Sequence, residues 1–364
     1  MKEVDIKYKQ LLEDIIKNGV EKDTRAGRVK SVFGRQLSFD ISETFPILTT
    51  KKVPYKGVLR ELLWFLQDGK DGTMNIRPLI EKGVEIWTPD AYRWFKEKIS
   101  KNLKDDSKFI IFKDEDVNED FKTKSDLMLM GIAKFRELAL KGYKLKKLDR
   151  GMFELFNWEY EFGDLGAVYG TQWRSFGESG IDQIKDIIEK LKTNPDDRRM
   201  LCLAYNPEVL DSVALPPCHV MMQFYTRPLS IEERQKIAKK ELSLKELDEK
   251  GIPSRGLSCM WTQRSVDVPL GLTWNIISYC CLTYMLAEIV NMVPDKLCGS
   301  LGDCHIYLNQ MDGVQEHLSR EGTDCNPQLR ILRHVTDIDD FKFEDFELVG
   351  YEPQGPIKMP LSVG

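Results

Sequence analysis

Histidine is scarce in this chain of 364 residues, which has four copies at His219, His305, His317 and His334. They lack the short spacings at which imidazoles share a metal ion, so the sequence predicts no metal site. The eight cysteines include no CxxC pair and no dense spacing. They are typical of free thiols, and a disulfide framework is excluded as the basis of the fold.

Basic charge is not in excess either. The chain has 53 Lys and Arg against 58 Asp and Glu, a formal net charge of -5, whereas a dedicated nucleic-acid binder has a basic surplus. No N-terminal signal is visible, and no apolar run approaches the roughly 20 residues that span a bilayer. We expect a protein of the cytoplasm, or of the host cytoplasm if the gene is viral, that requires neither nucleic acid nor a membrane.

One cysteine gives the clearest chemical signal. Cys218 lies in Leu215-Pro216-Pro217-Cys218-His219, between the pair Arg198-Arg199 and the run Gln263-Arg264-Ser265-Val266-Asp267. A thiolate can attack an electron-poor ring carbon, and nearby positive charge lowers the pKa of the thiol. Arginine binds phosphate through paired hydrogen bonds. The pattern predicts covalent catalysis on a phosphorylated heterocycle; the competing interpretation is a buried, inert cysteine.

Hydrophobic periodicity predicts an α+β fold. Apolar residues recur at helical spacing in residues 6–17, 58–66 and 181–191, and Gly19 ends the first of these helices. Residues 275–290 are apolar nearly all round, as in a helix buried in a large core. Short β-prone runs lie at residues 200–204, 220–225 and 257–262. We expect one domain over residues 1–364, a large mixed sheet flanked by helices.

Two segments are expected to be inserts in this domain. The segment at about 95–160 is rich in charge but has spaced apolar residues such as Met128, Phe135 and Leu138, which predicts a small helical subdomain. The segment at about 227–256 has charged helical patterns and predicts a helical excursion between two strands. Both are interpreted as solvated surface additions without catalytic residues.

Short runs in a fixed order resemble one enzyme family over most of the chain. They are Phe45-Pro46-Ile47-Leu48-Thr49-Thr50-Lys51-Lys52, Glu61-Leu62-Leu63-Trp64-Phe65-Leu66, Gly163 to Arg174, Asp196-Asp197-Arg198-Arg199, Cys218-His219, Gln263 to Asp267, Asn275 to Tyr279, Gly302 to Tyr307 and Ile357 to Pro360. These runs resemble the thymidylate synthase family, which adds a one-carbon unit to C5 of dUMP. The resemblance implies the same fold, with the sheets of two subunits packed back to back in a homodimer.

The resemblance also implies a covalent mechanism. Cys218 would attack C6 of dUMP, so that C5 accepts the one-carbon unit of the co-substrate 5,10-methylenetetrahydrofolate. Glu61 lies in an otherwise apolar helix, where an unpaired carboxylate is costly to bury, so a raised pKa and a proton relay through water are expected. Tyr169 and His219 match positions that assist proton removal at C5. Asn275 matches the residue that donates to O4 and accepts from N3–H of uracil, which favours dUMP over a cytosine nucleotide.

The resemblance assigns residues to both ligands. The substrate-binding residues that it implies are Arg25, Arg198, Arg199, Gln263, Arg264, Ser265, Asn275, His305 and Tyr307, with Arg198 and Arg199 donated across the dimer interface. His305 and Tyr307 match the pair that bonds the deoxyribose 3'-hydroxyl. The folate-binding residues that it implies are Trp87, Leu215, Asp267, Gly271, Trp274 and Val363, and Asp267 is also among the catalytic residues.

Departures from the family gather around the folate. Thr273-Trp274 stands where Pro-Phe is usual, Thr88 follows Trp87 where Asp or Asn is usual, and Val363-Gly364 adds a residue to the usual aliphatic terminus. In the family this terminus closes over the ligands and excludes water. Imperfect closure would let water capture the exocyclic methylene, giving 5-hydroxymethyl-dUMP and tetrahydrofolate. A dUMP hydroxymethylase therefore stands as the alternative to methylation.

Two alternatives come from other functional classes. An inactive homologue that binds a nucleotide or RNA would not need Cys218, Glu61, Asn275 and Tyr169 together, so their joint presence argues against it. A cysteine hydrolase using Cys218 and His219 is disfavoured because adjacent residues of a strand point to opposite faces.

Overall fold

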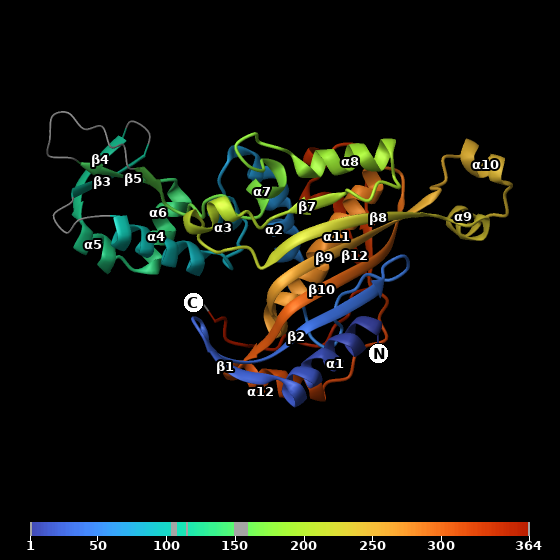
Figure 1. The fold of residues 1–364 in the computed structure, drawn as a ribbon, viewed down its shortest axis with the longest axis horizontal. Helices are drawn as coiled ribbons and strands as arrows, with labels where there is room; N and C mark the ends of the chain where they lie inside the picture. The colour runs from blue at the N-terminus through green and yellow to red at the C-terminus, as the bar shows by residue number, and fades with distance from the viewer. Residues whose placement is uncertain (1, 103–107, 114–115, 149–158, 363–364) are drawn as a thin grey trace.

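A six-stranded mixed sheet forms the centre of the protein. We describe a computed structural model, which covers residues 2–102, 108–113, 116–148 and 159–362. The strands of the sheet are β1 (Val20–Thr24), β2 (Gly27–Asp40), β7 (Leu201–Leu203), β8 (His219–Pro228), β9 (Arg255–Asp267) and β10 (Val293–Tyr307). Their order is β1-β2-β10-β9-β8-β7 (Figure 1), in which β9 and β10 run parallel and the other neighbours antiparallel. The predicted α+β fold with a large mixed sheet is confirmed.

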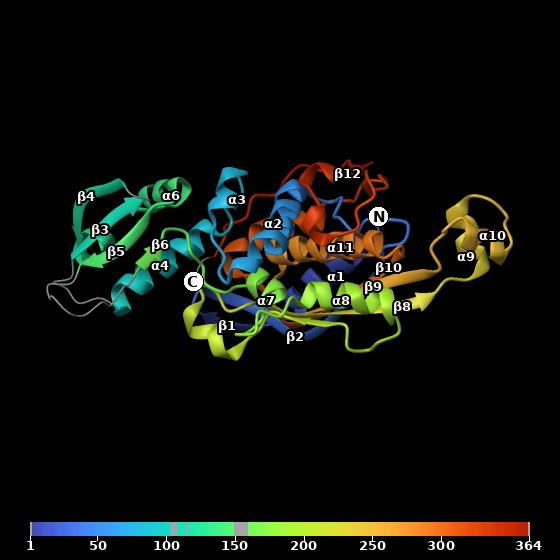
Figure 2. The ribbon, with the colours of Figure 1, turned by 90° about the horizontal axis from the view of Figure 1, so that it is seen from above.

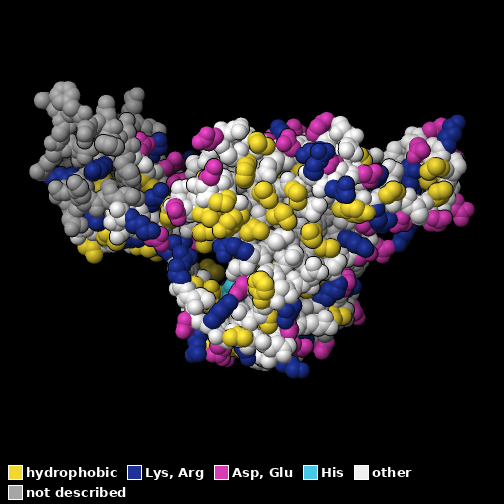
Figure 3. All heavy atoms as spheres, in the orientation of Figure 1, with side chains coloured by type: hydrophobic (Ala, Val, Ile, Leu, Met, Phe, Trp, Pro, Cys, Tyr) yellow, Lys and Arg dark blue, Asp and Glu magenta, His cyan; other side chains and the backbone are white. Residues whose placement is uncertain are grey.

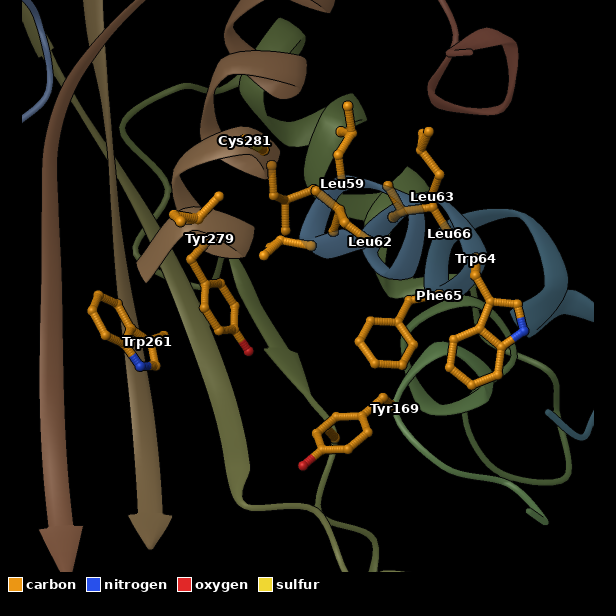
Figure 4. Packing of buried hydrophobic residues seen from close by; sticks show 14 of the residues in the cluster. Leu59, Leu62, Leu63, Trp64, Phe65, Leu66, Tyr169, Trp261, Tyr279 and Cys281 are labelled. Carbon is orange, nitrogen blue, oxygen red and sulfur yellow. The ribbon is translucent and has the colours of Figure 1, made fainter. Parts of the chain in front are cut away.

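Helices cover one face of this sheet, as Figure 2 shows. Helix α11 (Thr273–Ile289) packs on β9 and β10, and α2 (Tyr55–Asp68) packs on α11. Phe65 of α2 lies against Tyr169, with ring centroids 5.2 Å apart, in a shared aromatic and aliphatic core that includes Tyr279 (Figure 4). The other helices around this core are α1 (Glu3–Asn18), α3 (Arg77–Glu81), α7 (Gly170–Arg174), α8 (Gln183–Thr193) and α12 (Met311–Ser319).

The core helix is longer and more apolar than expected. Together with the turn before it, it forms the segment Val268–Ile289, which by length and composition alone could cross a membrane. The prediction that no apolar run approaches this length is therefore wrong. Within its most apolar window 72% of the residues are buried inside the protein. The sheet and α2 supply the apolar surroundings that a helix of this kind requires.

The predicted start of α8 is also wrong. Ile181 lies outside the helix, pairs with Phe176 in an isolated bridge and is 46% exposed. The helix begins instead at Gln183, because the side chain of Asp182 accepts a hydrogen bond from the Lys185 N–H and caps it.

No helix among the described residues covers the other face of the sheet. Along β7 and β8, exposed Leu201, Leu203 and Tyr225 alternate with residues that are buried toward the helices. Figure 3 shows hydrophobic side chains gathered over this face. An apolar surface of this kind is typical of an interface.

The first insert contains a four-stranded sheet as well as helices, whereas the sequence predicted a small helical subdomain. Its elements are α4 (Thr88–Asn102), β3 (Lys108–Lys113), β4 (Asp116–Thr123), α5 (Lys124–Leu129), α6 (Ile132–Lys141), β5 (Lys144–Leu148) and β6 (Glu159–Glu161), and its strands are ordered β4-β3-β5-β6. Its own aromatic core joins Phe95, Phe135 and Phe162. In β3, Phe109 and Ile111 are buried at the period of two that identifies a strand.

The second insert forms two short helices between β8 and β9, as predicted. Helices α9 (Ile231–Ala238) and α10 (Leu244–Glu249) each begin with a capping box, and they project from the sheet (Figure 1). Arg227 holds the base of this excursion through ion pairs to Glu233 and Asp295. Beyond α12, the strands β11 (Gln328–Ile331) and β12 (Phe346–Val349) form a separate antiparallel pair.

Candidate active site

The candidate site lies at one end of the central sheet. The parallel strands β9 and β10 finish there at Asp267 and Tyr307, and the antiparallel β8 starts there directly after Cys218. The backbone N–H of Arg264 donates to the carbonyl of Cys218 at 2.8 Å, which joins the loop of the nucleophile to β9. Figure 3 shows the surface hollowed between the β1–β2 hairpin and the segment that leads into β8.

Cys218 has a hydroxyl and a guanidinium as close neighbours. Its backbone N–H donates to Tyr169 Oη at 2.7 Å, and Arg264 Nη2 lies 3.8 Å from its Sγ. The carbonyls of Pro216 and Pro217 accept from the Arg264 guanidinium and hold it in place. Burial raises the pKa of the Cys218 thiol, and Arg264 opposes this rise only in part. The expectation that arginine makes the pKa of this thiol low is therefore wrong.

His219 points away from the nucleophile and into the core. Its Nδ1 lies 2.6 Å from Tyr279 Oη, and its ring stacks on Tyr169 with centroids 4.0 Å apart. Burial lowers the pKa of His219 to about 3, so the imidazole is neutral at physiological pH. This placement agrees with the argument that His219 is not the direct base for its neighbour.

Glu61 is buried on α2 between two tryptophans. Trp87 Nε1–H donates to its Oε1 at 2.6 Å, and Trp274 Nε1–H donates to its Oε2 at 2.5 Å. Burial raises the pKa of Glu61 to about 7, although both hydrogen bonds oppose the rise. The predicted raised pKa is confirmed. Trp87, which was expected at the pterin, directs its indole N–H at this carboxylate.

Asn275 is oriented by a line of hydrogen bonds. Trp261 Nε1–H donates to Gln263 Oε1 at 3.1 Å, and Gln263 Nε2 donates to Asn275 Oδ1 at 3.1 Å. Gln263 is buried, so the amide of Asn275 is held by a fixed partner. An amide held this way presents its NH₂ group and a second lone pair of its oxygen to a ligand.

His305 and Tyr307 lie next to each other at the end of β10. Their rings meet edge to face with centroids 5.2 Å apart, and His305 Nδ1 lies 2.9 Å from Asp303 Oδ1. Ser265 lies opposite Asp303 on the neighbouring strand. Arg25 sits in the β1–β2 turn on the same side. Burial raises the pKa of Tyr307, and Arg25 is among the groups that oppose the rise.

Of the residues expected around the folate, Asp267 and Gly271 lie close together where β9 ends. The Oδ1 of Asp267 accepts from the Leu270 N–H at 3.1 Å, and burial raises the pKa of this carboxyl. A Cβ at Gly271 would lie 3.9 Å from that of Asp267. Leu215 is half-buried against the core. Val363, which was expected to close the site, lies outside the described residues.

Arg198 and Arg199 are not part of this group within one chain. They precede β7 at the edge of the sheet, and Arg199, which is paired with Asp197, is 83% exposed. The pairing of Leu201 with Gln223 places Arg199 opposite Tyr225. Tyr225 is seven residues along β8 from Cys218, which corresponds to roughly 20 Å at the rise per residue of a β-strand.

Two polar residues of the site were missed from the sequence. The buried Gln310 donates from Nε2 to Asp267 Oδ2 at 3.0 Å and to the Pro360 carbonyl at 3.2 Å. Lys51 donates to the Pro269 carbonyl at 2.6 Å, and burial lowers its pKa to about 8. Lys51 lies within the first of the runs that resemble the family, and Gln310 lies three residues after the run that ends at Tyr307. Their position in or next to these runs could have identified them as site residues.

Comparison with known proteins identifies the family. A family model described as thymidylate synthase matches residues 6–363. The human protein named thymidylate synthase is 35% identical over 371 residues, covering 99% of this chain and 91% of that protein. The Candida albicans protein of the same name is 37% identical over 380 residues, covering 98% and 96% respectively. This chain therefore belongs to the thymidylate synthase family.

Proposed function

We propose that the protein methylates dUMP to dTMP, using 5,10-methylenetetrahydrofolate as the co-substrate. The observation that supports this most directly is the convergence of Cys218, Asn275 and Glu61 at one end of the sheet, with Arg264 Nη2 3.8 Å from the thiol sulfur. The relatives at 35% and 37% identity are both named thymidylate synthase.

The proposed reaction begins with bond formation between Cys218 Sγ and C6 of the uracil ring. The electron pair of the C5–C6 double bond moves toward O4, where the Asn275 amide donates a hydrogen bond, and C5 becomes nucleophilic. The folate supplies the one-carbon unit and, for a methyl product, the hydride. The hydrogen at C5 leaves as a proton and the bond from the one-carbon unit to the folate nitrogen breaks, which leaves an exocyclic methylene on C5. Addition of the hydride to this methylene expels the Cys218 thiolate and restores the C5–C6 double bond.

The pKa values of the site fit its proton transfers. The Cys218 thiol is protonated at neutral pH, because burial raises its pKa. Its proton must therefore be lost as the substrate binds. Glu61, with a pKa of about 7, can take up and release protons at physiological pH. His219 is neutral and serves to position Tyr169 through ring stacking.

The residues present fit a folate. Trp274 and Leu215 are both half-buried against the core, so part of an indole ring and part of an aliphatic side chain stay exposed. A pterin presents a flat face and a row of hydrogen-bond donors, which match an aromatic ring and a carboxylate. These side chains would bind and orient the co-substrate. Hydrogen bonds from the Leu270 N–H and from Gln310 Nε2 fix the orientation of the Asp267 carboxylate.

We propose that the protein works as a homodimer. The uncovered apolar face of the sheet supports this, because such a face on a subunit is typical of an interface. Arg198 and Arg199 support it as well, since they lie too far along the sheet to bind the phosphate of their own site. Donated to the partner, they would complete a phosphate site with Arg25, Arg264 and Ser265.

Hydroxymethylation of dUMP is the second candidate. The residues of the nucleotide site serve both reactions, and the product depends on whether water reaches the exocyclic methylene. Gln310 favours methylation, because its bonds to Asp267 and to the Pro360 carbonyl hold the C-terminal segment close to the folate side.

The two products can be separated in one experiment. The protein is incubated with dUMP and 5,10-methylenetetrahydrofolate while the absorbance of dihydrofolate is followed and the nucleotide is identified by mass. We expect dTMP and dihydrofolate in equal amounts. Hydroxymethyl-dUMP without dihydrofolate would establish the second candidate. Cys218→Ser serves as the control: it should abolish turnover and still bind dUMP, whereas an inactive homologue would show no turnover with either form.

A further inference from the structure

We propose that Trp274 is a positioning residue, which together with Trp87 clamps both oxygens of the Glu61 carboxylate and favours its ionised form, the proton acceptor of the site. The inference builds on the proposed function, which gives Glu61 its task. It assigns Trp274 a role toward the protein's own carboxylate in addition to the expected contact with folate.

The geometry of the clamp is specific. Each oxygen of Glu61 accepts one indole N–H, Oε1 from Trp87 at 2.6 Å and Oε2 from Trp274 at 2.5 Å. The three residues come from three parts of the chain, since Glu61 is on α2, Trp274 on α11 and Trp87 directly before α4. An ionised carboxylate accepts well at both oxygens, whereas the hydroxyl oxygen of the neutral acid is a poor acceptor. Two fixed donors therefore favour the ionised form.

The indoles are the principal stabilisers of this charge. Among the described residues Glu61 takes part in no ion pair, and burial alone favours the neutral acid. Tyr169, directly before α7, is a titratable neighbour of Glu61, and the charge of Glu61 contributes to raising its pKa. Tyr169 is buried and neutral. Without a cation nearby, the protonation of Glu61 depends on hydrogen bonds.

The protein accommodates the Trp274 ring in a way that fits this role. The ring packs on α2 at Gly57, where a Cβ would lie only 3.1 Å from Cη2 of the indole. The absence of a side chain at Gly57 lets the indole approach the same helix that bears Glu61. A phenylalanine at position 274 would fill the space and lack the N–H.

The test is an infrared titration of the Glu61 carboxyl group, identified as the band that Glu61→Gln removes. In Trp274→Phe we expect the pKa of Glu61 to rise by about one unit, the size expected for one lost bond to a charged group. Trp87→Phe should raise it similarly. The matched control is Trp94→Phe, because the buried Trp94 Nε1 has no hydrogen-bond partner among the described residues. This control should leave the titration unchanged.

Activity gives a second measurement. The acid limb of kcat/KM against pH should move to higher pH in Trp274→Phe by the same amount as the infrared titration. If Trp274→Phe is folded and Glu61 titrates as in the wild type, the proposal is wrong. If Trp274→Phe does not fold, Gly57→Ala, which crowds the indole, should raise the pKa of Glu61 in the same direction, and an unchanged value would overturn the proposal. A shifted titration in an enzyme that makes no dTMP would instead refute the proposed function.

Discussion

At the scale of single residues, Glu61 shows how much a buried charge costs. A rise in pKa from 4.5 to about 7 means that the folded protein favours the neutral over the ionised carboxyl by about 3 kcal/mol more than the unfolded chain does. The two indole bonds have already reduced this preference. A cation would reduce it further, but it would also lower the pKa out of the range in which Glu61 can exchange protons at neutral pH.

This cost predicts a pH-dependent difference in stability. The native state binds the Glu61 proton more tightly than the unfolded state, so its contribution to the free energy of unfolding falls as pH rises from 4.5 to about 7. Glu61→Gln does not titrate. Measured by urea unfolding, the stability of this variant relative to wild type should rise by about 3 kcal/mol between about pH 4.5 and about pH 8. Glu178→Gln, at an exposed glutamate, is the matched control.

Gln310 provides a second prediction at this scale. Gln310→Leu removes the donor to Asp267 and to the Pro360 carbonyl, so we expect the KM for the folate to rise about tenfold and the share of hydroxymethyl product to increase. The KM for dUMP should change little. Gln235→Leu is the matched control, because it removes a single bond to the Leu242 carbonyl in the excursion. Equal KM values for the folate in Gln310→Leu and wild type would contradict the prediction.

Residue types predicted some of this chemistry and not the rest. The raised pKa of Glu61 followed from one acidic residue in an apolar helix. The pKa of Cys218 could not be predicted, because it depends on how far burial outweighs Arg264, and the number of protein atoms around a thiol is set by the assembled fold. The role of Trp274 as a donor depends on the crossing of α2 and α11, which periodicity does not specify.

At the scale of elements, the strongest patterns predicted best. Helices α1, α2 and α11 were expected within a few residues of their observed bounds, because α1 has regular apolar spacing and α2 and α11 are long, mostly apolar runs. The strands of the first insert were not expected, because β3 is short and its alternation of apolar and polar residues lies within a highly charged segment. The start of α8 depended on a cap at Asp182 that outweighed the apolar Ile181.

Arg174 supports the arrangement of several elements. Its side chain is fully buried at the end of α7 and bonds the carboxylates of Asp182 and Asp339, so it ties α8 to the C-terminal part of the chain. Arg174→Met leaves these carboxylates without their buried partner and should lower the free energy of unfolding by about 3–5 kcal/mol. Arg330→Met, at an exposed pair with Glu347, should lower it by less than about 1 kcal/mol. Urea unfolding of both variants measures the difference.

The helical excursion should be dispensable. At its base, the Leu229 N–H donates to the Ser254 carbonyl at 2.9 Å, so β8 and β9 are still paired there. Replacing residues 230–253 with Asn-Gly provides a two-residue hairpin turn. Because the excursion lies at the end of β8 opposite Cys218, kcat/KM should stay within about twofold of wild type. A larger loss in steady-state assays would show that α9 and α10 contribute to catalysis or assembly.

At the scale of the whole molecule, the proposed dimer can be tested by mixing inactive variants. Cys218→Ser and the double variant Arg198→Ala, Arg199→Ala should each have little activity. Subunit exchange should restore activity, because one site of the mixed dimer has an intact Cys218 and receives intact arginines from the partner. Mixing Cys218→Ser with Arg264→Ala is the control. Cys218 and Arg264 belong to the same chain's site, so no intact site can form; activity there, or none in the first mixture, would contradict the proposed arrangement.

The two indoles on Glu61 have a practical consequence. Tryptophan emission depends on the charge of groups that touch the ring, and here two of the seven tryptophans donate to one carboxylate. The protein's intrinsic fluorescence should therefore change as this one group gains its proton. Fluorescence of the unlabelled enzyme can then show, in real time, whether Glu61 becomes protonated when a nucleotide alone binds or only after the folate has bound.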